Sequence, residues 1–250
     1  GKVRHNYILG VYSLYERLIQ EFPDVLFESC ASGGARFDPG MLYYAPQTWT
    51  SDDTDAVERI KIQYGTSYVY PLSSMGSHVS ASPNHQIFRS TSLETRGNVA
   101  YFGTFGYELD ITKLTEKELE QMKEQITFMK QHRDLIQKGE FYRLESPFKG
   151  NQAAWEVVAK DGSEGLMAYF RVRQPIQGKL ERIYFSGLEE TKAYEVRECF
   201  GEKTDFGVHY GDELMYVGFS VSDCSSGLVG VARTGQGDGY SRLFHFRKVN

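Results

Sequence analysis

The chain has 250 residues, of which 40% are hydrophobic, 14% aromatic and 24% charged, as in an ordinary globular protein and unlike a disordered or collagen-like one. Its 28 basic and 33 acidic residues give a net charge of -5. Because no basic stripe is visible, a nucleic acid partner is excluded. No apolar run reaches the roughly 20 residues that cross a bilayer, so no membrane partner is expected.

Three cysteines, Cys30, Cys199 and Cys224, are spaced too widely for a C-x-x-C metal motif or a disulfide framework. This favours a reducing, cytoplasmic location. The first residues lack the apolar segment of a secretory signal, and an amphipathic pattern begins almost at once. We therefore expect a fragment that starts inside a longer protein.

Apolar residues at helical spacing predict a first helix over about residues 6–20, ended by the turn signal around Pro23. The apolar run 25–30 then predicts a buried parallel strand, which leads into the glycine-containing loop 31–40. A second short strand is expected at 47–50. Strands followed by loops and helices in this way are typical of α/β proteins.

A helix is predicted to begin around Ala56, with either Thr54 or Asp55 as its N-cap. Two further strand-like runs follow at 67–70 and 99–103. The longest helix is then opened by a capping box, in which the side chains of residues 115 and 118 satisfy each other's backbone donors, and it closes near residue 139.

From about residue 141 the pattern changes to short alternating runs separated by glycine-containing turns, at 153–158, 165–172, 182–185 and 243–246. Runs at this spacing predict an antiparallel β-sandwich. The predicted fold class is therefore α/β plus all-β, with one part over residues 1–140 and a second over residues 141–250.

Polar residues gather at the ends of the first two predicted strands, over 28–38 and 49–55. Functional groups of parallel β/α folds lie at such carboxyl ends, where partial desolvation raises the pKa of a carboxyl group toward the range of a general acid. The alternative is structural: Asp53, Thr54 and Asp55 would cap a helix, and Cys30 would be a small buried apolar residue.

Several ordered motifs resemble glycoside hydrolase family 36, the bacterial α-galactosidases. Residues 27–42 are similar to the C-x-x-G-x-x-R loop of that family, and residues 47–59 are similar to its acid/base segment. The similarity continues in order through residues 62–67, 71–80 and 102–110. It is dense over about residues 7–110 and looser through the β region.

The resemblance implies the second half of a (β/α)8 TIM barrel followed by a C-terminal β domain. It also implies retaining hydrolysis of terminal α-1,6-linked galactose, which uses two carboxyl groups about 5–5.5 Å apart. Asp52 matches the acid/base residue. Cys30 and Gly33 match positions that contact galactose, whereas Arg36 is expected to hold the loop by pairing with a neighbouring carboxylate. His78 is expected at a strand end, in a structural role.

One part of the family pattern is missing. The nucleophile of the family is the Asp of a Lys-Trp-Asp-Met-Asn-type strand end, and no such motif occurs in this sequence. The chain would hold the acid/base residue without the nucleophile. We therefore expect the isolated chain to be inactive, or nearly so.

The expected partners are α-galactosides such as melibiose and raffinose, with galactose itself, and the resemblance suggests a homo-oligomer at full length. The sequence shows no metal ligand cluster, and retaining hydrolysis needs neither metal nor cofactor. Two alternatives stay open: a non-catalytic carbohydrate-binding or assembly module, and a related α-N-acetylgalactosaminidase or galactosyl transferase.

Overall fold

The structure is a computed structural model that describes residues 1–175, 182–200, 205–221 and 237–249. Its first part alternates helices with strands: α1 (Lys2–Glu21), β1 (Glu28–Ser29), α2 (Pro39–Tyr44), β2 (Gln47–Trp49), α3 (Ala56–Thr66), η1 (Leu72–Ser74), β3 (Met75–Ser80), α4 (Leu93–Ala100), β4 (Thr104–Glu108), η2 (Ile111–Lys113) and α5 (Glu116–Lys138). The four strands form one parallel sheet in the order β1-β2-β3-β4.

The second part is antiparallel: β5 (Glu140–Glu145), β6 (Gln152–Val158), β7 (Glu164–Arg171), β8 (Arg182–Ile183), β9 (Ala193–Glu198), β10 (Asp205–Tyr210), η3 (Glu213–Val217), β11 (Phe219–Ser220) and β12 (Tyr240–Lys248). Six of these strands form a sheet in the order β10-β9-β12-β7-β6-β5, and β11 pairs with β8. The predicted succession of a parallel α/β part and an antiparallel part is confirmed. Cys224 lies outside the described residues.

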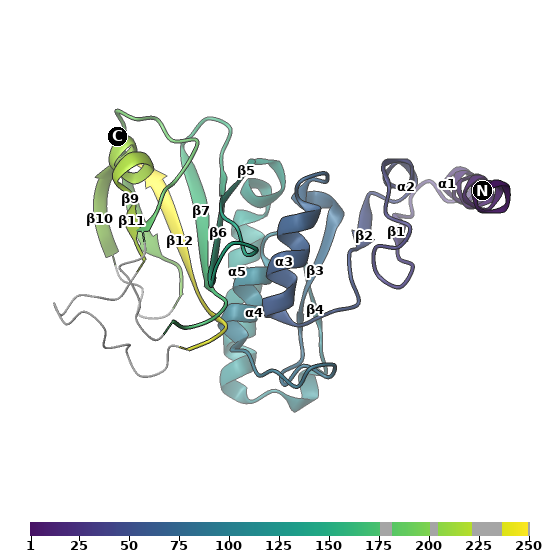
Figure 1. Cartoon of the computed structure of the whole chain (residues 1–250), viewed down its shortest axis with the longest axis horizontal. Helices are drawn as coiled ribbons and strands as arrows, with labels where there is room; N and C mark the ends of the chain where they lie inside the picture. The colour runs from purple at the N-terminus through teal and green to yellow at the C-terminus, as the bar shows by residue number, and fades with distance from the viewer. Residues whose placement is uncertain (176–181, 201–204, 222–236, 250) are drawn as a thin grey trace.

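The helices α3, α4 and α5 lie between the parallel sheet and the six-stranded sheet (Figure 1). One apolar cluster joins both parts, because Tyr64 and Phe102 share it with Trp155 and Leu166. A second cluster, with Tyr169 among its residues, fills the opposite face of the six-stranded sheet against β8 and β11. The central strands β6, β7 and β12 thus alternate their side chains between the two cores.

At the other end of the molecule, α1 and α2 extend away from this body (Figure 1). None of the residues of α1 is buried, and Tyr7 and Leu14 are about half exposed. Within the described ranges, no helix combines the length and apolar character needed to cross a membrane.

Most predicted helices are confirmed. The first runs over Lys2–Glu21, slightly beyond its expected bounds. Asp55 is the N-cap of α3, since its Oδ2 accepts from the backbone N–H groups of Val57 and Glu58 at 3.1 and 3.0 Å. The capping box of α5 is present, and its C-cap is Gly139.

Two predicted strands are wrong. Residues 67–70 form the turn that ends α3, where the Tyr70 N–H donates to the Thr66 carbonyl oxygen at 3.1 Å. Residues 99–103 hold the end of α4 and the following turn, because a short buried apolar run fits a helix as well as a strand. The strands in this part of the chain are instead β3 and β4. Of the predicted strand over residues 25–30, only Glu28–Ser29 is paired.

Candidate active site

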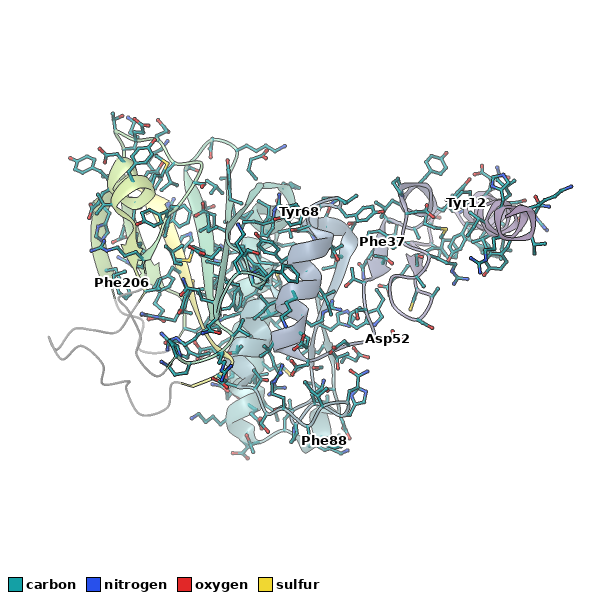
Figure 2. All side chains as sticks on the ribbon, viewed as in Figure 1. Tyr12, Phe37, Asp52, Tyr68, Phe88 and Phe206 are labelled. Carbon is teal, nitrogen blue, oxygen red and sulfur yellow. The ribbon has the colours of Figure 1, made fainter. Side chains whose placement is uncertain are left out.

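The loops after β1 and β2 lie side by side at the carboxyl edge of the parallel sheet. The Gly34 N–H donates to the Thr50 carbonyl oxygen at 3.1 Å, which ties the first loop to the second. Cys30 and Asp52, one on each loop, are both exposed. Figure 2 shows Asp52 where the chain passes from β2 to α3. The two polar strand ends found in the sequence are therefore brought together.

Gly33 is where the two loops touch most closely. Its φ is +70°, and a Cβ at this position would lie 2.7 Å from Ser51 Cα and 3.0 Å from the Asp52 backbone nitrogen. Only glycine fits both the left-handed backbone and the close approach. Gly33 thus sets the position of the backbone that carries Asp52.

Among the described residues Arg36 pairs with no carboxylate, so the expected ion pair is not found there. Its Nη2 donates to the Cys30 carbonyl oxygen at 2.8 Å, and its Nη1 donates to the Tyr7 hydroxyl at 3.0 Å. The nearest carboxylate in sequence, Asp38, is already engaged, because its Oδ1 accepts from the Tyr12 hydroxyl and the Met41 N–H at 2.7 and 2.9 Å. Arg36 still holds the loop, and it does so through neutral oxygens.

The three carboxylates of the acidic segment, Asp52, Asp53 and Asp55, have different contacts. Asp53 accepts from the Asp55 N–H at 3.0 Å, and Asp55 caps α3 and pairs with Arg89. Asp52 makes no hydrogen bond with any other described residue. Of the three residues expected to cap the helix, only Asp55 does so, while Asp53 supports the Asp55 backbone and Thr54 accepts from Asn84. Asp52 is exposed rather than desolvated, since no described segment covers it.

A buried arginine lies beneath this segment. Arg59 is 2% exposed; its Nη1 donates to the Ser51 carbonyl oxygen at 3.1 Å and its Nη2 to that of Gly76. Its guanidinium lies 4.7 Å from the Trp49 ring centroid. Burial lowers the pKa of Arg59 to about 10. Three polar and aromatic contacts thus fix the cation under the loop.

His78 lies within β3 and not at its end. Its ring packs on Trp49 with centroids 4.6 Å apart, and its Nδ1 lies 3.9 Å from Glu108 Oε2. Burial lowers its pKa, which favours the neutral imidazole. These contacts agree with the structural role expected for His78.

Arg59 and its contact with Trp49 were not predicted from the sequence. A signal was present, since Ala56, Arg59, Ile60 and Gln63 follow the i, i+3, i+4, i+7 spacing of one helix face. A cation on the apolar face of a short helix requires acceptors deep in the fold. The sequence does not say which carbonyl groups supply them.

Two family models match the chain. Residues 1–139 match the Melibiase model, and residues 152–246 match the glycosyl hydrolase family 36 C-terminal domain. Alpha-galactosidase AgaA of Geobacillus stearothermophilus is 56% identical over 225 residues, which are 90% of this chain and 30% of AgaA. Alpha-galactosidase Mel36A of Lactobacillus acidophilus is 42% identical over 253 residues, which are 100% of this chain and 32% of Mel36A.

Solved structures agree. An AgaA variant from Geobacillus stearothermophilus in complex with raffinose superposes with a TM-score of 0.88 at 51% identity, covering 98% of this chain and 32% of that one. The alpha-galactosidase of Lactobacillus brevis gives a TM-score of 0.89 at 49% identity, with 98% and 32% covered. The chain therefore spans about a third of the length of these relatives.

Proposed function

The chain belongs to glycoside hydrolase family 36, and from this premise we propose that it supplies the acid/base carboxyl group of a retaining α-galactosidase. Asp52 is that group. One observation supports the proposal most directly. Asp53 and Asp55 accept hydrogen bonds from the backbone, whereas Asp52 is exposed at the carboxyl edge of the sheet. Active sites of β/α barrels are built at this edge.

The parallel sheet is proposed to be part of a (β/α)8 barrel, and the six-stranded and two-stranded sheets a β-sandwich beside it. In support, β1 and β4 each have one unpaired edge among the described strands, and α1 buries none of its residues. A closed barrel would cover both edges and the apolar side of α1. The division at residue 140 remains a prediction.

The proposed reaction has two proton transfers. Asp52 first gives its carboxyl proton to the glycosidic oxygen, while the bond from that oxygen to the anomeric carbon breaks and a nucleophilic carboxylate bonds to this carbon. Asp52 then takes a proton from water, whose oxygen displaces the nucleophile and restores the original configuration. The nucleophile belongs about 5–5.5 Å from Asp52 and has to come from residues other than these 250.

Cys30 and Gly33 are proposed to contact the galactose ring, and Arg36 to hold their loop. Raffinose and stachyose are bound by variants of AgaA, which supports terminal α-1,6-linked galactose, and so melibiose, as the substrate class. A homo-oligomer is proposed for the complete enzyme. A cytoplasmic location is proposed because Cys30 is a free, exposed thiol, which a reducing compartment preserves.

The proposal is tested in a chimera, called here the AgaA chimera, in which this chain replaces the matching segment of AgaA from Geobacillus stearothermophilus. The chimera should hydrolyse melibiose, and the 250-residue chain alone should not. Asp52→Asn in the chimera should lower kcat by about 10²–10⁴-fold, the contribution of a positioned general acid and base. Asp53→Asn is the matched control, because its Oδ1 still accepts from Asp55.

Azide distinguishes the two carboxyl roles. Azide needs no general base, so it should restore turnover of an aryl α-galactoside by the Asp52→Asn chimera and give the α-galactosyl azide. A β-azide product would instead mark Asp52 as the nucleophile. If the isolated chain hydrolysed substrate and lost this activity in Asp52→Asn, the proposal that the nucleophile lies outside these 250 residues would be contradicted. If the chimera bound galactose without any hydrolysis, the carbohydrate-binding module would be favoured.

A further inference from the structure

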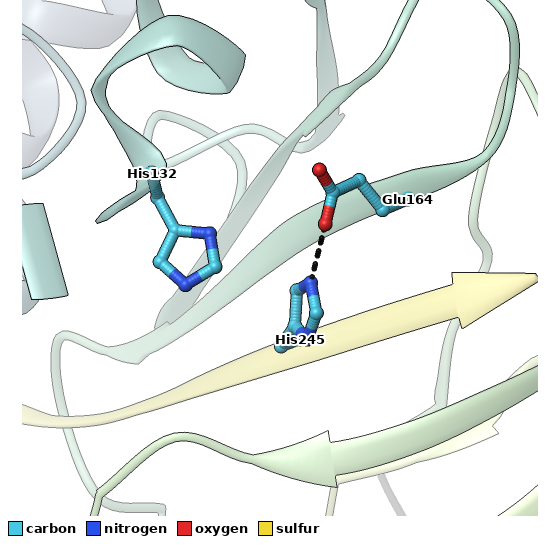
Figure 3. Close-up of side chains that lie close together, drawn as sticks. All are labelled: His132, Glu164 and His245. Atoms are coloured by element: carbon cyan, nitrogen blue, oxygen red, sulfur yellow. Dashed lines mark hydrogen bonds and ion pairs between the residues drawn. The ribbon is translucent and has the colours of Figure 1, made fainter.

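Far from the loops around Asp52, three side chains with metal-binding atoms converge between the long helix and the six-stranded sheet. His132 comes from α5, Glu164 from β7 and His245 from β12, as Figure 3 shows. One ligand atom from each of the three residues lies within 4.8 Å of the others. The described part of the chain has no other group of three such residues.

The fold places these residues together through strand register. In the antiparallel pair of β7 and β12, His245 lies opposite Leu166, and Arg247 lies opposite Glu164. Because residues two apart share a face, Glu164 and His245 are diagonal neighbours on the face that carries Leu166. Leu166 belongs to the core shared with α5, so this face is the one that the helix covers.

His132 stands at the edge of that contact. Its ring packs on Phe128 of the same helix, with centroids 4.5 Å apart, and faces His245 at 5.1 Å. Neither ring nitrogen of His132 donates to or accepts from another described residue. An imidazole with both ring nitrogens unengaged can offer a lone pair to a metal ion.

The distances fit a small tetrahedral ion after a modest adjustment. His245 Nε2 and Glu164 Oε2 are 3.0 Å apart, whereas two ligands of a tetrahedral zinc ion with bonds of about 2.1 Å are roughly 3.4 Å apart. His245 and Glu164 have to separate by about 0.4 Å, and His132, whose side chain is half-buried at the surface, has to approach them. The partial exposure of all three residues leaves room for water as the fourth ligand.

The surrounding charges are compatible with a cation. Arg197 lies opposite His245 on β9, but its guanidinium pairs with Glu195 at 2.6 Å. Arg247 lies opposite Glu164 and Glu195, so a carboxylate flanks it on either side. Two imidazoles and one carboxylate form a donor set suited to Zn²⁺.

We propose that His132, Glu164 and His245 form a Zn²⁺ site that links α5 to strands β7 and β12. The His245 N–H that donates to Glu164 has to be given up, or the ring turned, when the carboxylate and the imidazole take the metal. The site lies apart from Asp52, so its role is to hold the two parts of the fold together. This inference does not depend on the proposed function.

Titration of the 250-residue chain with Zn²⁺ by calorimetry near neutral pH tests the site. One Zn²⁺ per chain should bind, and His132→Gln, Glu164→Gln and His245→Gln should each weaken its affinity by more than about tenfold. His209→Gln is the matched control, because His209 contacts Glu213 and the Phe206 carbonyl oxygen and not the three residues. It should leave the affinity unchanged.

A second measurement separates metal binding from folding. Zn²⁺ should raise the Tm of the wild-type AgaA chimera and of its His209→Gln variant, and leave the Tm of the His132→Gln chimera where it is without metal. Co²⁺ should show the visible absorption of a tetrahedral site in the wild type only. The proposal is overturned if no stoichiometric binding is found in either protein, or if the three ligand variants bind as tightly as His209→Gln.

Discussion

Arg59 donates through Nη1 to the carbonyl oxygen of Ser51, 3.1 Å away, from a position almost completely inside the protein. Ser51 directly precedes Asp52, so a buried cation on α3 holds the backbone of the proposed proton donor from beneath. Gly33 holds the same backbone from the opposite loop. The backbone that carries the exposed Asp52 carboxylate is therefore held in place from two sides.

Arg59→Met in the AgaA chimera removes both donated hydrogen bonds while keeping most of the side-chain volume. It should lower kcat by about ten- to a hundredfold with little change in KM, because a displaced proton donor affects the transition state more than binding. Steady-state kinetics on melibiose measure both constants. Arg59→Lys keeps the charge and one donor, so its kcat should be intermediate; an unchanged kcat in Arg59→Met would show that the support is not needed.

Gly33→Ala places a methyl group 2.7 Å from Ser51 Cα at a φ of +70°. The left-handed backbone alone costs about 1–2 kcal/mol for a non-glycine residue, so the Tm and the kcat of the chimera should both fall. Gly65→Ala is the control, since nothing lies within 4 Å of that position on α3, and it should raise the Tm slightly. Equal effects of the two substitutions would contradict the close contact.

Glu156 on β6 is fully buried, and burial raises its pKa well above 4.5. The folded state then holds this proton more tightly than the unfolded state, so each pH unit above about 4.5 lowers the free energy of unfolding by up to about 1.4 kcal/mol until the folded pKa is reached. Glu156→Gln, which still accepts from the Ser186 N–H, should remove this loss.

Thermal melting of the chimera between acidic and neutral pH measures this effect. The Tm of Glu156→Gln should exceed that of the wild type at neutral pH, and the difference should shrink toward pH 4.5. Glu140→Gln, at an exposed position of β5, should follow the wild type throughout. A constant difference across the range would mean that Glu156 is ionised in the folded protein.

The exposed apolar side of α1 predicts self-association of the chain alone. Leu14 is 53% exposed and Tyr7 55%, and contiguous apolar surface of this kind drives association. Sedimentation should show concentration-dependent association of the 250-residue chain, weakened by Leu14→Lys. In the chimera the same substitution should lower the Tm, because a closed barrel would bury Leu14; an unaffected Tm would contradict the barrel.

The sequence predicted elements that depend on local signals. The capping box of α5 and the N-cap of α3 are satisfied by residues three positions apart or fewer, so they can be found without knowing the fold. Strand β3 was missed because its serines are buried by distant partners, with Ser77 donating to Gln63 and Ser80 to the Thr54 carbonyl oxygen. Because these serines are polar, the sequence of this core strand has the composition of a loop.

Site residues that belong to a sequence motif could be predicted, whereas contacts between residues far apart in the sequence could not. Asp52 and Gly33 were found through their motifs. The partners of Arg36 were not predicted, because the choice of Tyr7 over a carboxylate follows from how α1 packs. His132, Glu164 and His245 escaped notice because two of them are 81 residues apart.

The ring of Trp155 on β6 lies 5.6 Å from that of Phe102 and 6.3 Å from that of Phe141, so the strand and the preceding helical layer share one interior. Recombination between two related proteins could join the β strands of one to the helices of the other. The side chains of this shared core would then come from two different proteins. Any break between α3 and β12 would join core side chains from two different proteins, because this one cluster takes residues from both elements.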